Sequence, residues 1–203
     1  MPTSVSHFES GEQQTQAARL GMWIFLGSEL LLFAGLFALY AASRAAMPAA
    51  FHAAIAHSEK ILGSINTGVL LVSSTLAALS VRALEQGNRR GCLLALGGTL
   101  LLAATFLGIK VTEYGLHFRE GIFPGGSTTG ERGAPIFWTL YFVSTGLHAI
   151  HVLVGMGVLS LAARGVARGQ IPRERAYVLE NATLYWHLVD LIWIFLWPLY
   201  YLA

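Results

Sequence analysis

Hydrophobic residues are grouped in this chain into five long runs that are bounded by charged residues. Helices are predicted at about residues 18–43, 61–82, 91–115, 134–163 and 178–202. A bilayer core about 30 Å thick needs roughly 20 apolar residues per helical span, and each run meets this length. The runs are continuously apolar, whereas a membrane β-strand alternates polar and apolar residues. We therefore predict an all-α polytopic membrane protein, built as a bundle of five transmembrane helices.

The spans leave no room for a separate soluble domain. Residues 1–203 are predicted to form a single membrane domain with a short polar tail at residues 1–16. This tail contains Glu9 and Glu12 and lacks the basic region and small-residue cleavage site of a signal peptide. We therefore expect the first hydrophobic run to be a retained helix. The longest connection, from Lys110 to Gly133, contains a Pro-Gly-Gly-Ser run that is typical of a flexible loop.

The composition agrees with a membrane location. Of the 203 residues, 55% are hydrophobic and 12% are charged, and the mean hydropathy is +0.58, whereas about 25% of residues are charged in soluble domains. The formal net charge is +2 without any block of like charges, so nucleic acid is not expected as a partner. Cys92 is the single cysteine, which excludes an intrachain disulfide and a zinc site built on cysteines.

Arginine and lysine are distributed unevenly between the two sides of the predicted bundle. Eight lie on the side of the N-terminus and five on the opposite side, where Lys110 is counted as a loop residue. The positive-inside rule then predicts a cytoplasmic N-terminus and a C-terminus outside. Aromatic residues near the outer ends of two spans are expected to act as interface anchors. These are Trp138, Tyr141, Trp197, Tyr200 and Tyr201.

A few polar side chains lie deep inside the predicted spans. Counting from the span ends places Glu29, His148 and Asp190 near the middle of three helices. A carboxylate at the bilayer centre costs at least about 2.5 kcal/mol, so it needs a partner, a proton or a polar cavity. His151 lies three residues after His148, and Asp190 three after His187, so each pair shares a helix face. Three interpretations of these polar residues are open. They are an interhelical polar seam, a proton relay or lipid headgroup site near Glu29, and a metal site.

A heme held between two helices is the metal site that has to be weighed. His148 and His187 lie on different helices, but His148 and His151 are too close along one helix to serve opposite faces of one heme. Cys92 does not supply the further ligands of a copper centre. No catalytic, cofactor-binding or metal-binding residue is therefore predicted in this chain. We expect Glu29 to be a neutral hydrogen-bond donor to a neighbouring helix or a lipid.

Motifs in the spans resemble subunit III of the heme–copper terminal oxidases, and they follow one another in the order of that family. They comprise Trp23, Ser28, Glu29 and Gly35 in the first span, Asn66, Ser73 and Ser74 in the second, Glu113 with Tyr114 after the third, Gly146, His148 and His151 in the fourth, and Trp186, His187, Asp190 and Trp193 in the fifth. The chain resembles the short bacterial form with five helices, and the orientation of that form agrees with the loop charges.

The resemblance implies a subunit without redox centres that packs directly against catalytic subunit I, with subunit II and a small subunit IV as further partners. Heme and copper would reside in partner subunits, and phospholipid would be bound between helices. Roles in lipid binding, proton uptake or interhelical polar contacts are implied for Ser28, Glu29, Glu113, His148, His151, His187 and Asp190. Packing roles are implied for Trp23, Gly35, Asn66, Ser73, Ser74, Gly146, Trp186 and Trp193.

The implied activity is therefore that of a complex in the respiratory chain of a bacterial plasma (inner) membrane. We expect cytochrome c oxidase in preference to quinol oxidase. An accessory protein of a nitric oxide reductase resembles the chain in the same helices and is the first alternative. A free-standing transporter is the second, but it should show helices broken by Gly or Pro around a site, whereas Pro135 and Pro198 lie near span ends.

Overall fold

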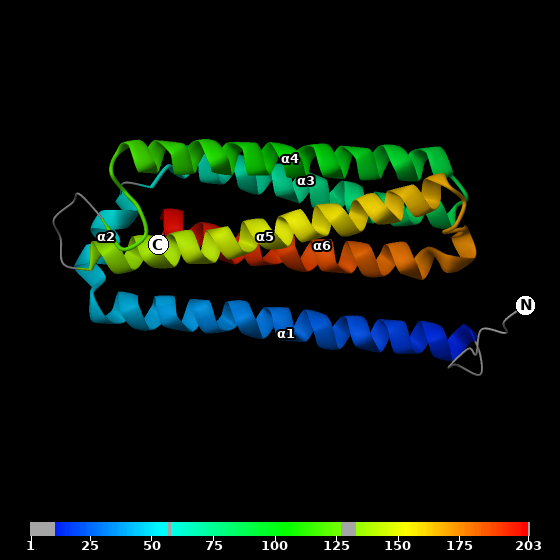
Figure 1. Ribbon diagram of the computed structural model, residues 1–203, viewed down its shortest axis with the longest axis horizontal. Helices are drawn as coiled ribbons and strands as arrows, with labels where there is room; N and C mark the ends of the chain where they lie inside the picture. Colours follow the sequence, from blue (N-terminus) through cyan, green and yellow to red (C-terminus); the bar gives the residue numbers. More distant parts are fainter. Residues whose placement is uncertain (1–10, 57, 127–132, 203) are drawn as a thin grey trace, which may run out of the picture.

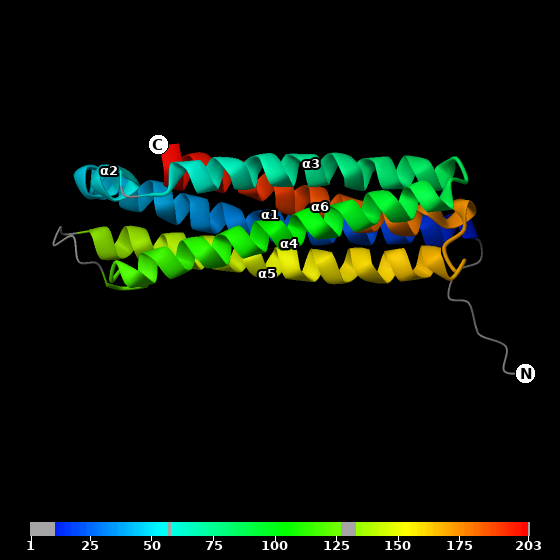
Figure 2. The same cartoon turned by 90° about the horizontal axis from the view of Figure 1, so that it is seen from above.

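The computed structural model describes residues 11–56, 58–126 and 133–202, which form a bundle of long helices (Figures 1 and 2). The elements are α1 (Gly11–Ala46), α2 (Pro48–Ala56), α3 (Lys60–Glu85), α4 (Arg89–Arg119), α5 (Ala134–Ala167), a 3-10 helix (Arg173–Arg175), α6 (Ala176–Trp197) and a π-helical turn (Pro198–Leu202). Five segments within these ranges are long and apolar enough to cross a membrane. The predicted all-α architecture with five candidate spans is confirmed.

Successive long helices run in opposite directions, so that the connections alternate between two ends of the bundle (Figure 1). One end, here called the arginine-rich end, carries the start of α1, the α3–α4 turn and the connection from α5 to α6. The α3–α4 turn is short because Gly87 adopts a left-handed φ of 76° and the Asn88 side chain accepts a hydrogen bond from Gly91 N at 2.9 Å. The opposite end carries α2 and the C-terminal turn.

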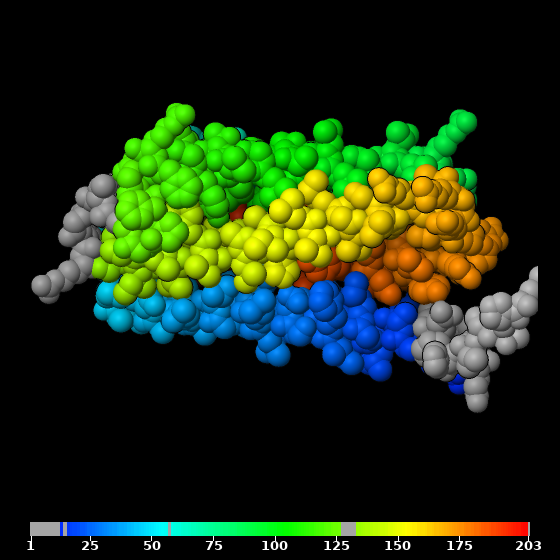
Figure 3. Space-filling model, viewed as in Figure 1, coloured from blue at the N-terminus to red at the C-terminus, as the bar shows by residue number. Residues whose placement is uncertain are grey.

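Burial differs strongly between the candidate spans. The buried share of residues was compared over the most apolar part of each span. It is 50% in the last span and 11% in the first. α6 lies between α3, α5 and α1 and contributes the buried rings of Trp186 and Trp193. α1 packs along α5 and α6 and forms one edge of the molecule in the space-filling view (Figure 3). α6 is therefore the central helix of the bundle and α1 is a peripheral one.

Glycine allows close approach at two of these contacts. A Cβ atom at Gly155 of α5 would lie 2.8 Å from the Trp186 ring of α6. A Cβ atom at Gly63 of α3 would lie 2.8 Å from the ring of Tyr201. Helices in membranes associate through close van der Waals packing, which small residues permit. These two glycines therefore let large aromatic rings fill the interior.

The helix bounds differ from the sequence prediction at several places. Residues 1–10 of the predicted polar tail lie outside the described residues, while α1 already begins at Gly11. α2 was not predicted because its nine residues are too short for a search that requires a full span. α4 extends from Arg89 to Arg119, so Lys110 lies inside a helix, in line with the predicted helix 91–115, and the expectation that it is a loop cation is wrong.

The predicted interface anchors are also corrected. Trp138, Tyr141, Tyr200 and Tyr201 are fully buried, whereas Trp197 is partly buried. Their distance along the helix axis was consistent with an outer interface, but their rings point into the bundle. An interface anchor must face the lipid headgroups, and the first four of these rings instead pack on one another and on neighbouring helices.

Candidate functional site

α1 and α5 are joined near their middle by a contact between Glu29 and His151. His151 Nε2 lies 2.8 Å from Glu29 Oε2, and His151 Nδ1 donates a hydrogen bond to the Leu147 carbonyl at 2.8 Å. Because a carbonyl oxygen only accepts, Nδ1 carries a hydrogen, and the Nε2–Oε2 contact holds one further proton shared by the two groups. The pair is therefore formally neutral whichever group holds that proton. Glu29 thus has its partner on a neighbouring helix.

The surroundings of this pair are mainly aromatic. The ring centroids of Phe33 and His151 are 5.2 Å apart, and the Tyr185 hydroxyl donates to the His151 carbonyl at 3.3 Å. The Glu29 and His151 side chains keep 18% and 13% of their surface exposed. Ser28 is exposed, and its hydroxyl donates to the Phe25 carbonyl of its own helix at 2.7 Å. The carboxyl–imidazole pair therefore lies at the edge of the helix bundle, and Ser28 does not take part in it.

A row of three hydrogen bonds joins α3 to α6. Trp186 Nε1 donates to Ser73 Oγ at 3.1 Å, and Trp193 Nε1 donates to Thr67 Oγ1 at 3.1 Å. Next to the first of these contacts, Ser74 Oγ lies 2.7 Å from His187 Nδ1. Hydroxyl groups of α3 thus lie within hydrogen-bond distance of ring nitrogens of α6. Of the residues for which an interhelical polar seam was one alternative, His187 takes part in this row.

Three other predicted residues are brought into the interior but not paired. Within the described part of the chain, no hydrogen-bond partner reaches the carboxyl oxygens of Asp190, the amide of Asn66 or the ring nitrogens of His148. Ser74 lies near Asp190, but its hydroxyl is bonded to His187. His148 packs between aromatic rings, with its centroid 5.6 Å from that of Phe106 and 5.2 Å from that of Trp193. His148 therefore points into the core, while His151 on the same helix points toward α1.

Glu113 is the centre of a buried charged cluster near the end of α4. Glu113 Oε2 accepts a hydrogen bond from Lys110 Nζ at 3.0 Å, and Oε1 accepts from the hydroxyls of Tyr141 at 2.6 Å and Tyr201 at 2.5 Å. His117 Nε2 lies 3.9 Å from Oε1. The cluster joins α4 to α5 and to the C-terminal turn, and each of these side chains is almost completely buried.

The sequence interpretation missed most of this cluster. Lys110 was assigned to a loop and Tyr141 and Tyr201 to the interface, while only Glu113 was among the predicted residues. The signal that was available is the spacing of three residues between Lys110 and Glu113, which places opposite charges on one helix face. The predicted helix 91–115 already contained both residues, but the pair was overlooked because Lys110 was counted as a loop cation.

Further hydrogen bonds hold the C-terminal turn. The hydroxyls of Tyr200 and Ser144 lie 3.0 Å apart, and the hydroxyl of Tyr40 donates to the Leu199 carbonyl. Together with Tyr201, these contacts connect the turn to α1, α4 and α5. The end of the last span is therefore packed as part of the core.

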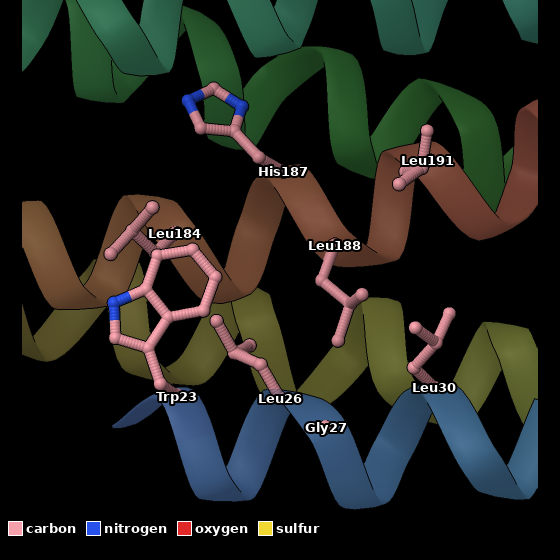
Figure 4. Close-up of a pocket in the computed structure, with 8 residues that line it drawn as sticks. All are labelled: Trp23, Leu26, Gly27, Leu30, Leu184, His187, Leu188 and Leu191. Atoms are coloured by element: carbon pink, nitrogen blue, oxygen red, sulfur yellow. The ribbon is translucent and has the colours of Figure 1, made fainter. Parts of the chain in front are cut away.

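A groove of about 370 Å³ separates α1 from α6 (Figure 4). Trp23, which is 63% exposed, lies along it together with Leu26, and α6 contributes Leu184 and Leu188. His187 also lines the groove, although Figure 4 shows its ring directed away from α1. The lining is almost entirely apolar. Such a groove suits a hydrocarbon chain.

Gly35 and Gly146 were expected to have roles in subunit or helix packing, and the structure places both away from tight contacts with the described residues. A Cβ atom at Gly35 would meet nothing within 4 Å, and one at Gly146 would meet only the Tyr114 hydroxyl at 3.9 Å. Neither glycine is therefore required by a close helix contact within residues 11–56, 58–126 and 133–202.

Metal-ligating side chains do not gather in the described ranges, where no group of three or more His, Cys, Asp or Glu residues could hold a metal ion. The two histidines weighed as heme ligands are engaged separately. His187 is bonded to Ser74, and His148 packs on Phe106 and Trp193. Cys92 is buried and lies apart as a free thiol.

Comparison with known proteins identifies the family of this chain. The family model described as cytochrome c oxidase subunit III matches residues 7–203. Quinol oxidase subunit 3 of Bacillus spizizenii is 31% identical, over 94% of this chain and 91% of the relative. Cytochrome c oxidase subunit 3 of Bacillus sp. strain PS3 is 33% identical, over 90% and 84%. For Lycodon semicarinatus, cytochrome c oxidase subunit 3 is 30% identical, over 96% and 72%. The chain therefore belongs to the subunit III family of the heme–copper terminal oxidases, as its motifs had indicated.

Proposed function

We propose that this chain is a non-redox subunit of a respiratory oxidase that reduces oxygen to water and pumps protons during aerobic electron transport. Heme and copper belong to partner subunits, and the chain packs directly against catalytic subunit I, with subunit II and a small subunit IV nearby. The observation that carries the proposal is the family match over residues 7–203. The enzymatic activity is that of the complex, and this chain stabilises subunit I within it.

Phospholipid binding is proposed for the groove between α1 and α6. Its wall is formed by leucines of both helices, with Trp23 exposed beside them. Because α1 is the least buried of the five spans, an acyl chain in this groove would add contacts between α1 and the rest of the bundle. A bound lipid would in this way support the packing of this chain against subunit I.

Support of proton uptake is proposed for the pair formed by Glu29 and His151. The two groups share one proton across 2.8 Å and keep part of their surface exposed near the middle of the span. Both also belong to the sequence motifs in which the chain resembles the family. A group that holds a proton at an accessible edge of the bundle is suited to this role.

We further propose that the N-terminus is cytoplasmic and the C-terminus outside, in a bacterial plasma membrane. Removing the buried Lys110 from the five basic residues counted on the C-terminal side leaves four, against eight at the arginine-rich end. The positive-inside rule then favours this orientation more strongly than the first count did. The Bacillus relatives support the plasma membrane.

Cytochrome c is proposed as the electron donor of the complex. The Bacillus sp. strain PS3 relative, which is 33% identical, is named for this donor, whereas the Bacillus spizizenii relative, 31% identical, is named for quinol. Quinol is therefore the direct alternative. The donor binds other subunits, so the choice must be made on the complex.

The experiment is to purify the complex through an affinity tag on this chain in mild detergent. We expect subunits I and II to co-purify with heme, and oxygen consumption to be driven by reduced cytochrome c. Oxygen consumption with quinol alone would reassign the donor. Reduction of nitric oxide without reduction of oxygen would assign the chain to a nitric oxide reductase, and recovery of the chain without heme proteins would refute the oxidase proposal.

A further inference from the structure

A second pocket, of about 280 Å³, lies at the arginine-rich end of the bundle. It is formed between the α3–α4 turn and the segment that joins α5 to α6. Arg89 and Arg173 line it together with Glu174, and its other walls include Leu84 and Ile171. The residues that line this pocket thus include two arginines and one glutamate beside apolar residues, whereas the groove between α1 and α6 is lined by no arginine.

The pocket lies where four of the candidate spans begin or end. One span ends at Glu85 and the next begins at Arg89, while Ala167 ends the fourth and Arg173 begins the fifth. In a bilayer, the ends of spans lie where hydrocarbon gives way to lipid headgroups. A ligand in this pocket would therefore meet the arginines at headgroup depth.

The charge of this end favours an anion. Eight arginines lie at this end. The acidic side chains that the structure describes there are Glu85, Glu174 and Glu180. Glu180 is paired with Arg19 at 3.1 Å. Glu174 accepts a hydrogen bond from Arg173 at 3.1 Å, but this bond uses Nε and leaves the terminal amino groups of the guanidinium for another acceptor.

The ligand chemistry follows from these features. Arginine binds phosphate through charge-assisted and often bidentate hydrogen bonds. Basic pockets between membrane helices on the cytoplasmic side bind anionic headgroups. The positive end of the α4 dipole, at Arg89, lies beside the same pocket and acts in the same direction.

We propose that this pocket binds the phosphate of an anionic phospholipid such as phosphatidylglycerol. Arg89 and Arg173 hold the phosphate, and Leu84 and Ile171 contact the glycerol and the first acyl carbons. The inference rests on the proposed function in one respect, since it requires this end of the chain to lie at a membrane surface. It adds the class of lipid and the residues that select it.

The test uses the complex purified through this chain and placed in nanodiscs of phosphatidylcholine with increasing fractions of phosphatidylglycerol. Native mass spectrometry then measures how much phosphatidylglycerol stays bound. The variant is Arg89→Gln with Arg173→Gln. The matched control is Arg90→Gln with Arg168→Gln, which removes two charges from the same end without altering the pocket lining. We expect the pocket variant to lose about tenfold or more in affinity for phosphatidylglycerol, and the control to keep it.

Equal losses in both variants would show general attraction to a positive surface and would overturn the proposal, as would unchanged binding in the pocket variant. Inorganic phosphate is added as a separate arm. If it displaced phosphatidylglycerol at similar concentration, the pocket would recognise free phosphate and the lipid assignment would be wrong. The subunit content of the same preparation reports on the oxidase proposal, so failure of that proposal is distinguishable from failure of this one.

Discussion

Lys110 and Glu113 lie three residues apart on α4 and form an ion pair of 3.0 Å whose side chains are only 4% and 0% exposed. The hydroxyls of Tyr141 and Tyr201 surround the pair and connect it to α5 and the C-terminal turn. Charges in the interior are stable only when they are paired and hydrogen-bonded. This pair therefore fixes the relative position of three parts of the bundle.

Removing both charges of the pair is expected to destabilise the chain less than the sum of the two single removals. Lys110→Met or Glu113→Gln alone should destabilise the chain by about 3–5 kcal/mol, because an unpaired charge or a broken cluster stays buried. The Lys110→Met, Glu113→Gln double variant should lose less than the sum of the two. Thermal unfolding of the purified complex measures this coupling, and additive losses would contradict it.

The two C-terminal tyrosines should differ in importance. Tyr201→Phe removes a hydrogen bond to a carboxylate, which is worth about 1.5–3 kcal/mol, whereas Tyr200→Phe removes a bond to a hydroxyl, worth about 0.5–1.5 kcal/mol. Both rings stay in place, so the comparison isolates the hydroxyl groups. The melting temperature should therefore fall more for Tyr201→Phe. The reverse order would show that Tyr201 contributes mainly through ring packing.

Glu29 is expected to tolerate an amide. In Glu29→Gln, the side chain can still hydrogen-bond His151 Nε2, so assembly should stay nearly intact, whereas Glu29→Ala leaves the imidazole without this partner. The amount of subunit I that co-purifies with the tagged chain is the measurement. Ser28→Ala is the control, because that hydroxyl donates to the backbone of its own helix and has no other partner among the described residues, so the change should have no effect. Loss of subunit I from the Gln variant would refute the neutral-donor interpretation.

A matched pair of glycines tests the packing of α5 against α6. Gly155→Ala would place a methyl group 2.8 Å from the Trp186 ring, and overpacking of this kind costs about 1–3 kcal/mol. Gly157→Ala lies on the same helix with nothing within 4 Å of its Cβ position. That variant should be neutral or slightly stabilising, since alanine favours a helix over glycine. Equal melting temperatures for the two variants would mean that the α5–α6 contact adjusts without cost.

Much of the candidate site was accessible from residue types and spacing. Glu29, His151, Ser73, Ser74, Trp186, His187 and Trp193 were all named from the sequence, and the structure joins them through hydrogen bonds between helices. The partners could not be assigned beforehand. His148 and His151 share a helix face by spacing, yet one points into an aromatic core and the other to α1.

The sequence by itself determined five candidate spans and the depth of the polar residues within them. Lipid offers no hydrogen-bond partner to the backbone, so long apolar runs must be helical, and a rise of about 1.5 Å per residue converts position into depth. The family followed from motifs that are local in the chain.

Only the tertiary structure decided which way each side chain faces. In a soluble helix the apolar stripe marks the buried face, but here the lipid-facing and core-facing sides are both apolar. For this reason Tyr141 and Tyr201 were misassigned to the interface, and Lys110 to a loop, until packing brought all three to Glu113. The direction of a side chain around a membrane helix is set by the neighbouring helices, which sequence position alone does not reveal.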